Sequence, residues 1–379
     1  MSQKKSVTTI TPKITNIDET DDILKFTLQN VDVSIANAIR RTLLSDIPCV
    51  VFKTIPYNDS RVKIDINTTN FNNEYLKQRL SCIPIHIDDA DFPIDDYRLE
   101  IDVENTGEEV KYITTEDFRI KNTKMNNYLN QETVRKIFPA HSITHDFIDF
   151  VRLQPRISAT IPGGHLKLDC ALAIGTAGEE AMFNVVATAA YKFTQDPGLV
   201  ALEWDRIQET LRETKTREEL EFYKRDWLNL DAKRLYVKDS FDFIVETIGI
   251  YTNMRLIDLA CNIIIKKLIT IGQKFKNDES LINDAMNTME NCYDITLQNE
   301  DYTIGKILEH MLFRKYYGAG DQILSFCGFI KEHPHNSDAL IRVAFKNIIE
   351  TTEIVSILSE SITELLEIFK IIQDNFTSA

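Results

Sequence analysis

Two histidine pairs have the residue type and spacing closest to those of a metal site. His141 and His145 are four positions apart, so on a helix both would lie on one face, as zinc ligands often do. The residues between them include no glutamate, so the metalloprotease pattern is missing. His333 and His335 flank Pro334, which is typical of a surface turn. A structural role is the favoured interpretation of both pairs, and an enzyme that uses the neighbourhood of His141 and His145 is the weaker alternative.

The sequence also lacks the usual motifs for phosphate binding, nucleophilic catalysis and paired-cysteine chemistry. The glycines at 175 and 178 lack the Gly-Lys-Ser/Thr that follows in a phosphate-binding loop. The sequence contains no G-x-S-x-G, H-E-x-x-H or C-x-x-C motif. We therefore expect that the chain is not an enzyme by itself and that it holds no cofactor and no metal. The six scattered cysteines are expected to be reduced, as is usual in an intracellular protein, and they are Cys49, Cys82, Cys170, Cys261, Cys292 and Cys327.

The charge balance limits the partners that the chain can bind alone. Lys and Arg number 43 and Asp and Glu number 58, for a net charge of −15. Duplex binding needs cations that displace counterions, so we expect little direct nucleic-acid contact. The stretch 88–117 holds twelve carboxylates and two basic residues. This favours a solvated face, with a docking surface for a basic partner as the alternative. The N-terminus has no secretory h-region and no apolar run would span a membrane, so an intracellular chain without membrane contact is expected.

The elements that would position any site follow a recurring order. A chain of 379 residues, 43 % of them hydrophobic, predicts two or three globular domains. A helix is expected over 32–44, capped by Asp32 or Ser34, and strands flank it. Short strands with polar turns dominate 58–195, and 196–237 is a charged connecting segment. A strand from 240 then leads into an amphipathic helix, and the last hundred residues predict strand, helix, two strands and a long helix.

Two segments echo each other in sequence. Residues 32–39 (DVSIANAI) and 301–308 (DYTIGKIL) both read Asp-x-(Ser/Thr)-Ile-small-x-x-aliphatic and continue into an apolar helix. The echo and the repeated element order favour duplication of a module. The small residues Ala36 and Gly305 would let a neighbouring element approach the first helical turn. Two such modules can bury their helix faces against each other, so the sequence predicts an α+β fold with a pseudo-two-fold pair within one chain.

At this point the residues resemble a known family. The segment 30–41 (NVDVSIANAIRR) is similar to the signature of the alpha-like subunits of multisubunit RNA polymerases. Further matches follow in order along the chain, namely NTT at 67–69, NEYL at 73–76, RLSCIPI at 79–85, PGGHLKL at 162–168, VVATA at 185–189 and FIVETIG at 243–249.

The last hundred residues resemble the smaller partner of that family, subunit eleven, called L in archaea. The segment 300–308 (EDYTIGKIL) carries this likeness, followed by FCGF at 326–329 and LIRV at 340–343. The chain thus resembles third and eleventh subunits fused head to tail, an arrangement similar to that of nucleocytoplasmic large DNA viruses. It departs from the many third subunits that hold zinc or iron–sulfur clusters, because the insert region has only Cys82 and Cys170.

The resemblance implies a domain organisation. The first dimerization module comprises 10–57 and 238–280, an insert domain comprises 58–195, and the connecting segment comprises 196–237. The second, subunit-eleven-like module comprises 281–379. The helices of the two modules would share a core, for which we expect Ile35, Ile39, Leu43, Ile304, Ile307, Leu308 and Met311.

The resemblance also implies a function, which is a non-catalytic assembly platform of a DNA-directed RNA polymerase in transcription. Its partners would be the two large β-like and β′-like subunits and small polymerase subunits, and no homo-oligomer is expected. The expected large-subunit interface comprises Asn37, Arg40 and Arg41, since arginine suits such contacts. By the viral analogy the protein would occur in the host cytoplasm, the viral factory and the virion. The alternative is a free-standing acidic adaptor that keeps the fold.

Overall fold

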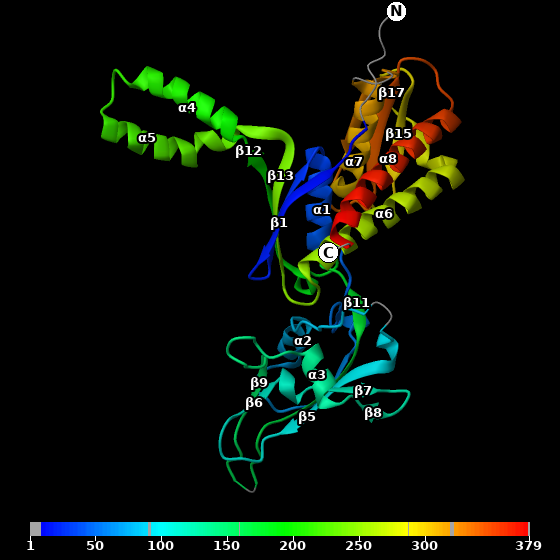
Figure 1. Cartoon of the computed structure of the whole chain (residues 1–379). Helices are drawn as coiled ribbons and strands as arrows, with labels where there is room; N and C mark the ends of the chain where they lie inside the picture. Colours follow the sequence, from blue (N-terminus) through cyan, green and yellow to red (C-terminus); the bar gives the residue numbers. More distant parts are fainter. Residues whose placement is uncertain (1–8, 90–91, 159, 287, 319–321, 378–379) are drawn as a thin grey trace, which may run out of the picture. The chain divides into compact units, whose positions relative to one another are not determined.

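The computed structural model describes residues 9–89, 92–158, 160–286, 288–318 and 322–377 (Figure 1). The chain divides into two compact units, each with its own core. The first unit contains the described residues up to Leu43, Thr188–Glu246 and the residues from Asn253 onward. The second unit contains Leu44–Ala187 and Thr247–Thr252. Helices and antiparallel sheets are mixed in the chain, which confirms the predicted α+β class.

The first module of unit 1 is a four-stranded sheet with helices on one face. Its strands are β1 (Lys13–Thr20), β2 (Ile23–Gln29), β13 (Tyr236–Thr247) and β12 (Val186–Gln195), in the spatial order β1-β2-β13-β12. The apolar side chains of β2 alternate, and Leu24, Phe26 and Leu28 are at most 2 % exposed. Phe26 stacks on its cross-strand neighbour Phe243 with ring centroids 4.9 Å apart. This period-two burial is what a half-covered strand requires. The module's helices are α1 (Val33–Ser45) and α6 (Asn253–Asn277).

The second module repeats this architecture. Its strands are β14 (Ile282–Asp284), β15 (Cys292–Leu297), β16 (Leu324–Ile330) and β17 (Ala339–Phe345), in the order β14-β15-β17-β16. Its helices are α7 (Tyr302–Leu312), which is extended by a π-helical turn at Phe313–Tyr317, and α8 (Thr351–Thr377). Each module therefore has two strands, a helix, two more strands and a long helix, with the same strand order. The structure confirms the predicted duplication.

The two modules pack against each other within unit 1. The long terminal helices α6 and α8 lie along one another, and α7 contacts both (Figure 1). Phe376 of α8 packs edge-on against Phe26 of the first module's sheet, with ring centroids 5.1 Å apart. The two sheets thus share a helical layer, which is the pseudo-dimer that the sequence predicts.

The segment between β12 and β13 is a helical hairpin, where the second module has only a short link. Its helices are α4 (Pro197–Leu211) and α5 (Arg217–Asn229), which run side by side (Figure 1). Trp204 and Trp227 meet at 5.6 Å between ring centroids and form a small core with Ala232. Asp196 and Thr216 cap the two helices through their side chains. The charged connecting segment is therefore an autonomous helical excursion.

Unit 2 contains a five-stranded sheet, two short helices and two strand pairs. The sheet order is β4 (Val62–Asn67), β10 (His165–Ala171), β5 (Tyr97–Glu104), β7 (Arg119–Asn122) and β8 (Asn127–Tyr128). The helices are α2 (Asn73–Ser81) and α3 (Gln131–Ile137). The strand pairs are β6 (Lys111–Thr114) with β9 (Asp149–Leu153), and β3 (Cys49–Val51) with β11 (Ala173–Gly175).

The bounds of unit 2 differ from the expected insert domain of 58–195. The unit begins at Leu44 because β3 pairs with β11, which places the residues after α1 in this unit. It also takes in Thr247–Thr252, where the Tyr251 hydroxyl donates to the Pro48 carbonyl over 2.9 Å. Long-range pairing of this kind leaves no local mark in the sequence.

The acidic stretch belongs to unit 2, and part of its charge is paired there. Asp91 lies outside the described residues. Four of the other carboxylates form ion pairs with cations from neighbouring strands, a turn and a helix, and these pairs are Asp96 with Lys124, Glu100 with Lys121, Asp102 with Lys167 and Glu116 with Arg135. This internal pairing supports the solvated-face interpretation of the stretch over the docking surface.

Candidate functional site

The helices α1 and α7 begin in the same way, at the two positions that echo each other in sequence. The Asp32 carboxylate accepts a 2.8 Å hydrogen bond from the Ser34 backbone N–H. The Asp301 carboxylate accepts one of the same length from the Thr303 N–H. Each aspartate thereby satisfies one of the backbone donors that a helix start leaves free.

The two aspartates also contact the opposite module. The Arg41 guanidinium of α1 forms an ion pair with Asp301, and its Nε donates to the Thr303 hydroxyl oxygen over 2.9 Å. His310 Nδ1 of α7 lies 3.5 Å from an Asp32 carboxylate oxygen. Arg41 follows Asp32 by 41 − 32 = 9 positions, and His310 follows Asp301 by 310 − 301 = 9 positions. The cap of each helix therefore contacts the residue of the other helix that lies nine positions after that helix's own cap. Such a reciprocal pair of contacts is the pattern of an isologous interface.

The two copies of this contact are not chemically equal. Burial raises the pKa of Asp301, but hydrogen bonds from Thr303 and the contact with Arg41 outweigh it and hold the pKa below the usual value. On the other side, burial lowers the pKa of His310, although nearby acidic groups oppose this. Ser34, the counterpart of Thr303, has a buried hydroxyl oxygen without a hydrogen-bond partner among the described residues. One copy pairs a carboxylate with a guanidinium that is always charged, whereas the other pairs a carboxylate with a histidine whose charge depends on protonation.

A hollow of about 430 Å³ lies beside the second copy of this contact. Its lining comes from the first turn of α1, from Tyr191 of β12 and from the last turn of α7. Lys306 and Glu309 of α7 lie on it and pair with each other at 2.6 Å. The hollow is therefore bordered by both modules, and the charges of Lys306 and Glu309 on its border balance each other.

The three residues of the predicted large-subunit interface lie together on α1. Asn37 borders the hollow and accepts a 2.9 Å hydrogen bond from Arg40 Nε. Arg40 is half-buried beside it, whereas Arg41 faces the start of α7. The tie between Arg41 and the second module is a contact that sequence reasoning missed. The echo of Asp32 with Asp301 was the signal that could have indicated it, because reciprocal contacts follow from duplication.

The predicted core residues of the two helices are all buried. The exposed fraction is 1 % or less for Ile35, Ile39, Leu43, Ile304, Ile307, Leu308 and Met311. Gly305, by contrast, has its role within its own module, because a Cβ there would lie 1.9 Å from Phe329 Cε2 of β16. The close approach expected at this position thus comes from an aromatic ring of the neighbouring sheet.

The histidines and cysteines show no arrangement for catalysis. His141 and His145 lie in an exposed turn, where the His145 N–H donates to the His141 carbonyl over 2.9 Å, and not on a helix. Over the ranges that the structure describes, no cluster of His, Cys, Asp or Glu could hold a metal. All six cysteines are free, and burial raises the pKa of Cys49 to about 11 and that of Cys170 to about 12. Such thiols carry almost no thiolate at neutral pH. Within the described part of the chain, no helix combines the length and the apolar character that a membrane span needs.

Two family models match the chain, one over each module. The model described as the RNA polymerase Rpb3/Rpb11 dimerisation domain matches residues 25–268, and a second with the same description matches residues 292–375. The first match covers α1 and most of α6, and the second covers α7 and nearly all of α8.

Curated relatives agree with these matches. The DNA-directed RNA polymerases I and III subunit RPAC1 of Homo sapiens is 25% identical over 305 residues, which are 67% of this chain and 81% of that protein. The DNA-directed RNA polymerases IV and V subunit 3B of Arabidopsis thaliana is 28% identical over 211 residues, 52% of this chain and 60% of the relative. The DNA-directed RNA polymerase II subunit rpb3 of Dictyostelium discoideum is 23% identical over 228 residues, 57% of this chain and 68% of the relative.

These relatives are named as subunits of DNA-directed RNA polymerases and the matched domain is a dimerisation domain, which is consistent with the expectation that this chain is not an enzyme by itself. The chain belongs to the RNA polymerase Rpb3/Rpb11 dimerisation-domain family, as an alpha-like RNA polymerase subunit that carries the dimerisation domain twice in one polypeptide.

Proposed function

We propose that this chain is the assembly platform of a DNA-directed RNA polymerase, on which the two large catalytic subunits associate. The observation that carries the proposal is the reciprocal contact between α1 and α7, which holds two dimerisation modules together in one chain. A preformed base lowers the entropic cost of bringing two large partners together. Fusion makes the pairing of the modules independent of concentration. The partners proposed are thus the β-like and β′-like subunits together with small polymerase subunits.

The large-subunit contact is proposed to lie on the α1 surface around Asn37, Arg40 and Arg41. Arg40 is the best of these positions for a test. Its guanidinium bonds only the neighbouring Asn37 side chain in the described structure, whereas Arg41 also ties the modules together. A charge reversal at Arg41 would therefore weaken both module pairing and partner binding. A charge reversal at Arg40 should weaken partner binding alone, because Arg40 does not join the modules.

The test is co-expression of the tagged chain with the two largest polymerase subunits of the same source. Recovery of all three in equal amounts, with RNA synthesis by the purified complex, is the expected result. Arg40→Glu should reduce recovery of a large subunit by roughly tenfold, because loss of an interface arginine costs on the order of 1–2 kcal/mol. The matched control is Arg217→Glu in α5. This arginine is exposed, and its ion pair with Glu221, at 3.8 Å, lies within its own helix. Elution of the chain as a lone 43.7 kDa monomer from cells that make both large subunits would instead support the adaptor function.

A viral origin and a site of action in the host cytoplasm, the viral factory and the virion are also part of the proposal. The fusion of two modules in one chain is the feature that supports it. Detection of the chain in purified virions, together with the large subunits and in equal amount, is the expected result. Its absence from particles that contain those subunits would contradict this part of the proposal alone.

A further inference from the structure

The sheet of the first module ends in a strand that is unusually open to pairing. β12 is the last strand in the order β1-β2-β13-β12, so one side of its backbone has no neighbour in the sheet. Among the described residues, β13 is the strand that pairs with β12 in this sheet, and no strand pairs with its other side. The strand is ten residues long, and Lys192 is its one charged side chain. Native proteins usually protect such an edge, since bare peptide groups recruit other strands.

The other sheet edges of the two modules show that protection. β1 carries a register shift between Thr15 and Asp18, and Asp18 and Glu19 add negative charge. β14 is three residues long. β16, the counterpart of β12, has a register shift near its start, between Leu324 and Phe326. Short strands, bulges and charges are the usual devices against edge pairing. In β12 alanines at 187, 189 and 190 leave room for a close neighbour.

A hollow borders β12 on its helix-facing side. It is the 430 Å³ hollow described above, and Val33, Tyr191 and Phe313 make its apolar part. Lys306 and Glu309 on its border neutralise each other, and the Asp32 carboxylate is engaged by the Ser34 backbone N–H. The hollow therefore fits an uncharged apolar side chain.

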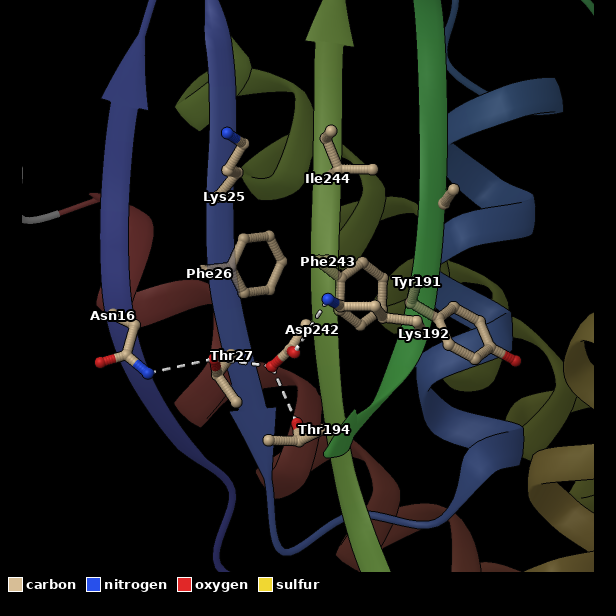
Figure 2. A pocket seen from close by; sticks show the side chains of 11 residues that line it. Asn16, Lys25, Phe26, Thr27, Tyr191, Lys192, Thr194, Asp242, Phe243 and Ile244 are labelled. Carbon is tan, nitrogen blue, oxygen red and sulfur yellow. Dashed lines mark hydrogen bonds and ion pairs between the residues drawn. The ribbon is translucent and has the colours of Figure 1, made fainter. Parts of the chain in front are cut away.

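A second hollow, of about 630 Å³, borders β12 on the outer face of the sheet (Figure 2). The Asp242 carboxylate lines this hollow and accepts hydrogen bonds of 3.0 Å from the Thr27 hydroxyl and 2.8 Å from the Thr194 hydroxyl. Lys192 Nζ lies 3.9 Å from the same carboxylate. Figure 2 shows these side chains together on one face, from three neighbouring strands. The hydroxyl and charged groups of this face suit the polar side chains of an added strand, although Ala190 and Ile244 also line the hollow.

We propose that β12 is a strand-addition site, which binds an extended segment of a partner polypeptide whose side chains alternate apolar and polar. The inference rests on the proposed function, because the partner would be another polymerase subunit. An added strand satisfies the open peptide groups of β12, and successive side chains point to opposite faces. Its apolar residues enter the α1–α7 hollow and its polar residues cover the Asp242 face.

A second copy of this chain fits the site less well. The helix-facing side chains of its own β12 would be Tyr191 and Phe193. Tyr191 is held against Phe241 with ring centroids 5.4 Å apart, and Phe193 stacks on Tyr236 at 4.4 Å. These rings are committed to their own sheet, so they are not free to fill the hollow of another copy.

The test compares hydrogen exchange of the amides of residues 188–194 in the isolated chain and in the assembled polymerase, at single-residue resolution. In the isolated chain every second amide should exchange rapidly, because only the others bond to β13. In the polymerase these rapid amides should slow by at least roughly a hundredfold, which is the alternating signature of an added strand. A complex that forms without this change overturns the strand addition and leaves the platform intact. Failure of any complex to form overturns both proposals.

A pair of variants tests the side-chain pattern. Val33 is 41 % exposed at the apolar hollow, and Ile17 is 43 % exposed on the opposite sheet edge, so both should accept lysine without unfolding. Val33→Lys should weaken recovery of the partner roughly tenfold and abolish the slowed exchange in β12, whereas Ile17→Lys should change neither. Equal behaviour of the two variants would overturn the apolar side of the proposal. Sedimentation of the isolated chain as a dimer with protected β12 amides would assign the edge to a second copy, and would overturn it too.

Discussion

The ion pair between Arg41 and Asp301 should stabilise the pairing of the two modules by an amount that a double-mutant cycle can measure. Asp301 has two roles, since it caps α7 through Thr303 N–H and pairs with Arg41 of the first module. Loss of an aspartate cap costs about 1 kcal/mol. The side chains of Arg41 and Asp301 are 33 % and 40 % exposed, so solvent screening limits the pair to about 0.5–1 kcal/mol. Asp301→Ala should therefore cost about 2 kcal/mol.

Asparagine separates the two roles, because it caps a helix as well as aspartate does. Asp301→Asn should cost only the ion-pair part, about 0.5–1 kcal/mol. Combined with Arg41→Ala it should show a coupling energy of the same size, because either substitution alone already removes the pair.

The assay is native-state hydrogen exchange of α7 amides, which reports local opening of the module interface. Tryptophan fluorescence would mislead, since both tryptophans of the chain, Trp204 and Trp227, lie in the α4–α5 hairpin. Because the pKa of Asp301 is lowered in the folded state, its contribution is present above about pH 4 and is lost as the pH falls through the folded pKa. A coupling energy of zero, or equal costs for Asn and Ala at 301, would refute the assignment of two roles.

Three further predictions concern other parts of unit 1. Gly305→Ala should destabilise the second module by about 1–3 kcal/mol, because the new methyl group overlaps the Phe329 ring. Calorimetry would measure this loss, with Ala36→Gly at the equivalent position of the first module for comparison. Because burial lowers the pKa of His310, the unfolded chain binds a proton more readily, so stability should fall as the pH drops below about 6.5. His310→Gln should flatten that slope in urea titrations at several pH values, and an unchanged slope would contradict it. Trp227→Ala should melt the α4–α5 hairpin, since loss of a buried aromatic costs about 3–5 kcal/mol, while exchange in α7 stays unchanged.

Local features of the fold were predictable because they depend on neighbours in sequence. The helix of α1 followed from its cap and from the spacing of apolar residues such as Ile35 and Ile39, and both residues are buried. The duplicated order of strands and helices followed from the echo between 32–39 and 301–308. The α4–α5 hairpin was predicted as a charged connecting helix or excursion. Its pairing of two helices was not predicted, because its core joins Trp204 of one helix to Trp227 of the other.

The sequence by itself determined the α+β class, the duplication and the resemblance to polymerase subunits, since periodicity, capping and motif order are written along the chain. Only the tertiary structure decided that Arg41 joins the second module, that the second copy of this contact uses His310, and that β12 is an open sheet edge between two hollows. These features depend on residues more than a hundred positions apart. Their geometry is set by how two packed modules share a helical layer, and no local pattern carries that information.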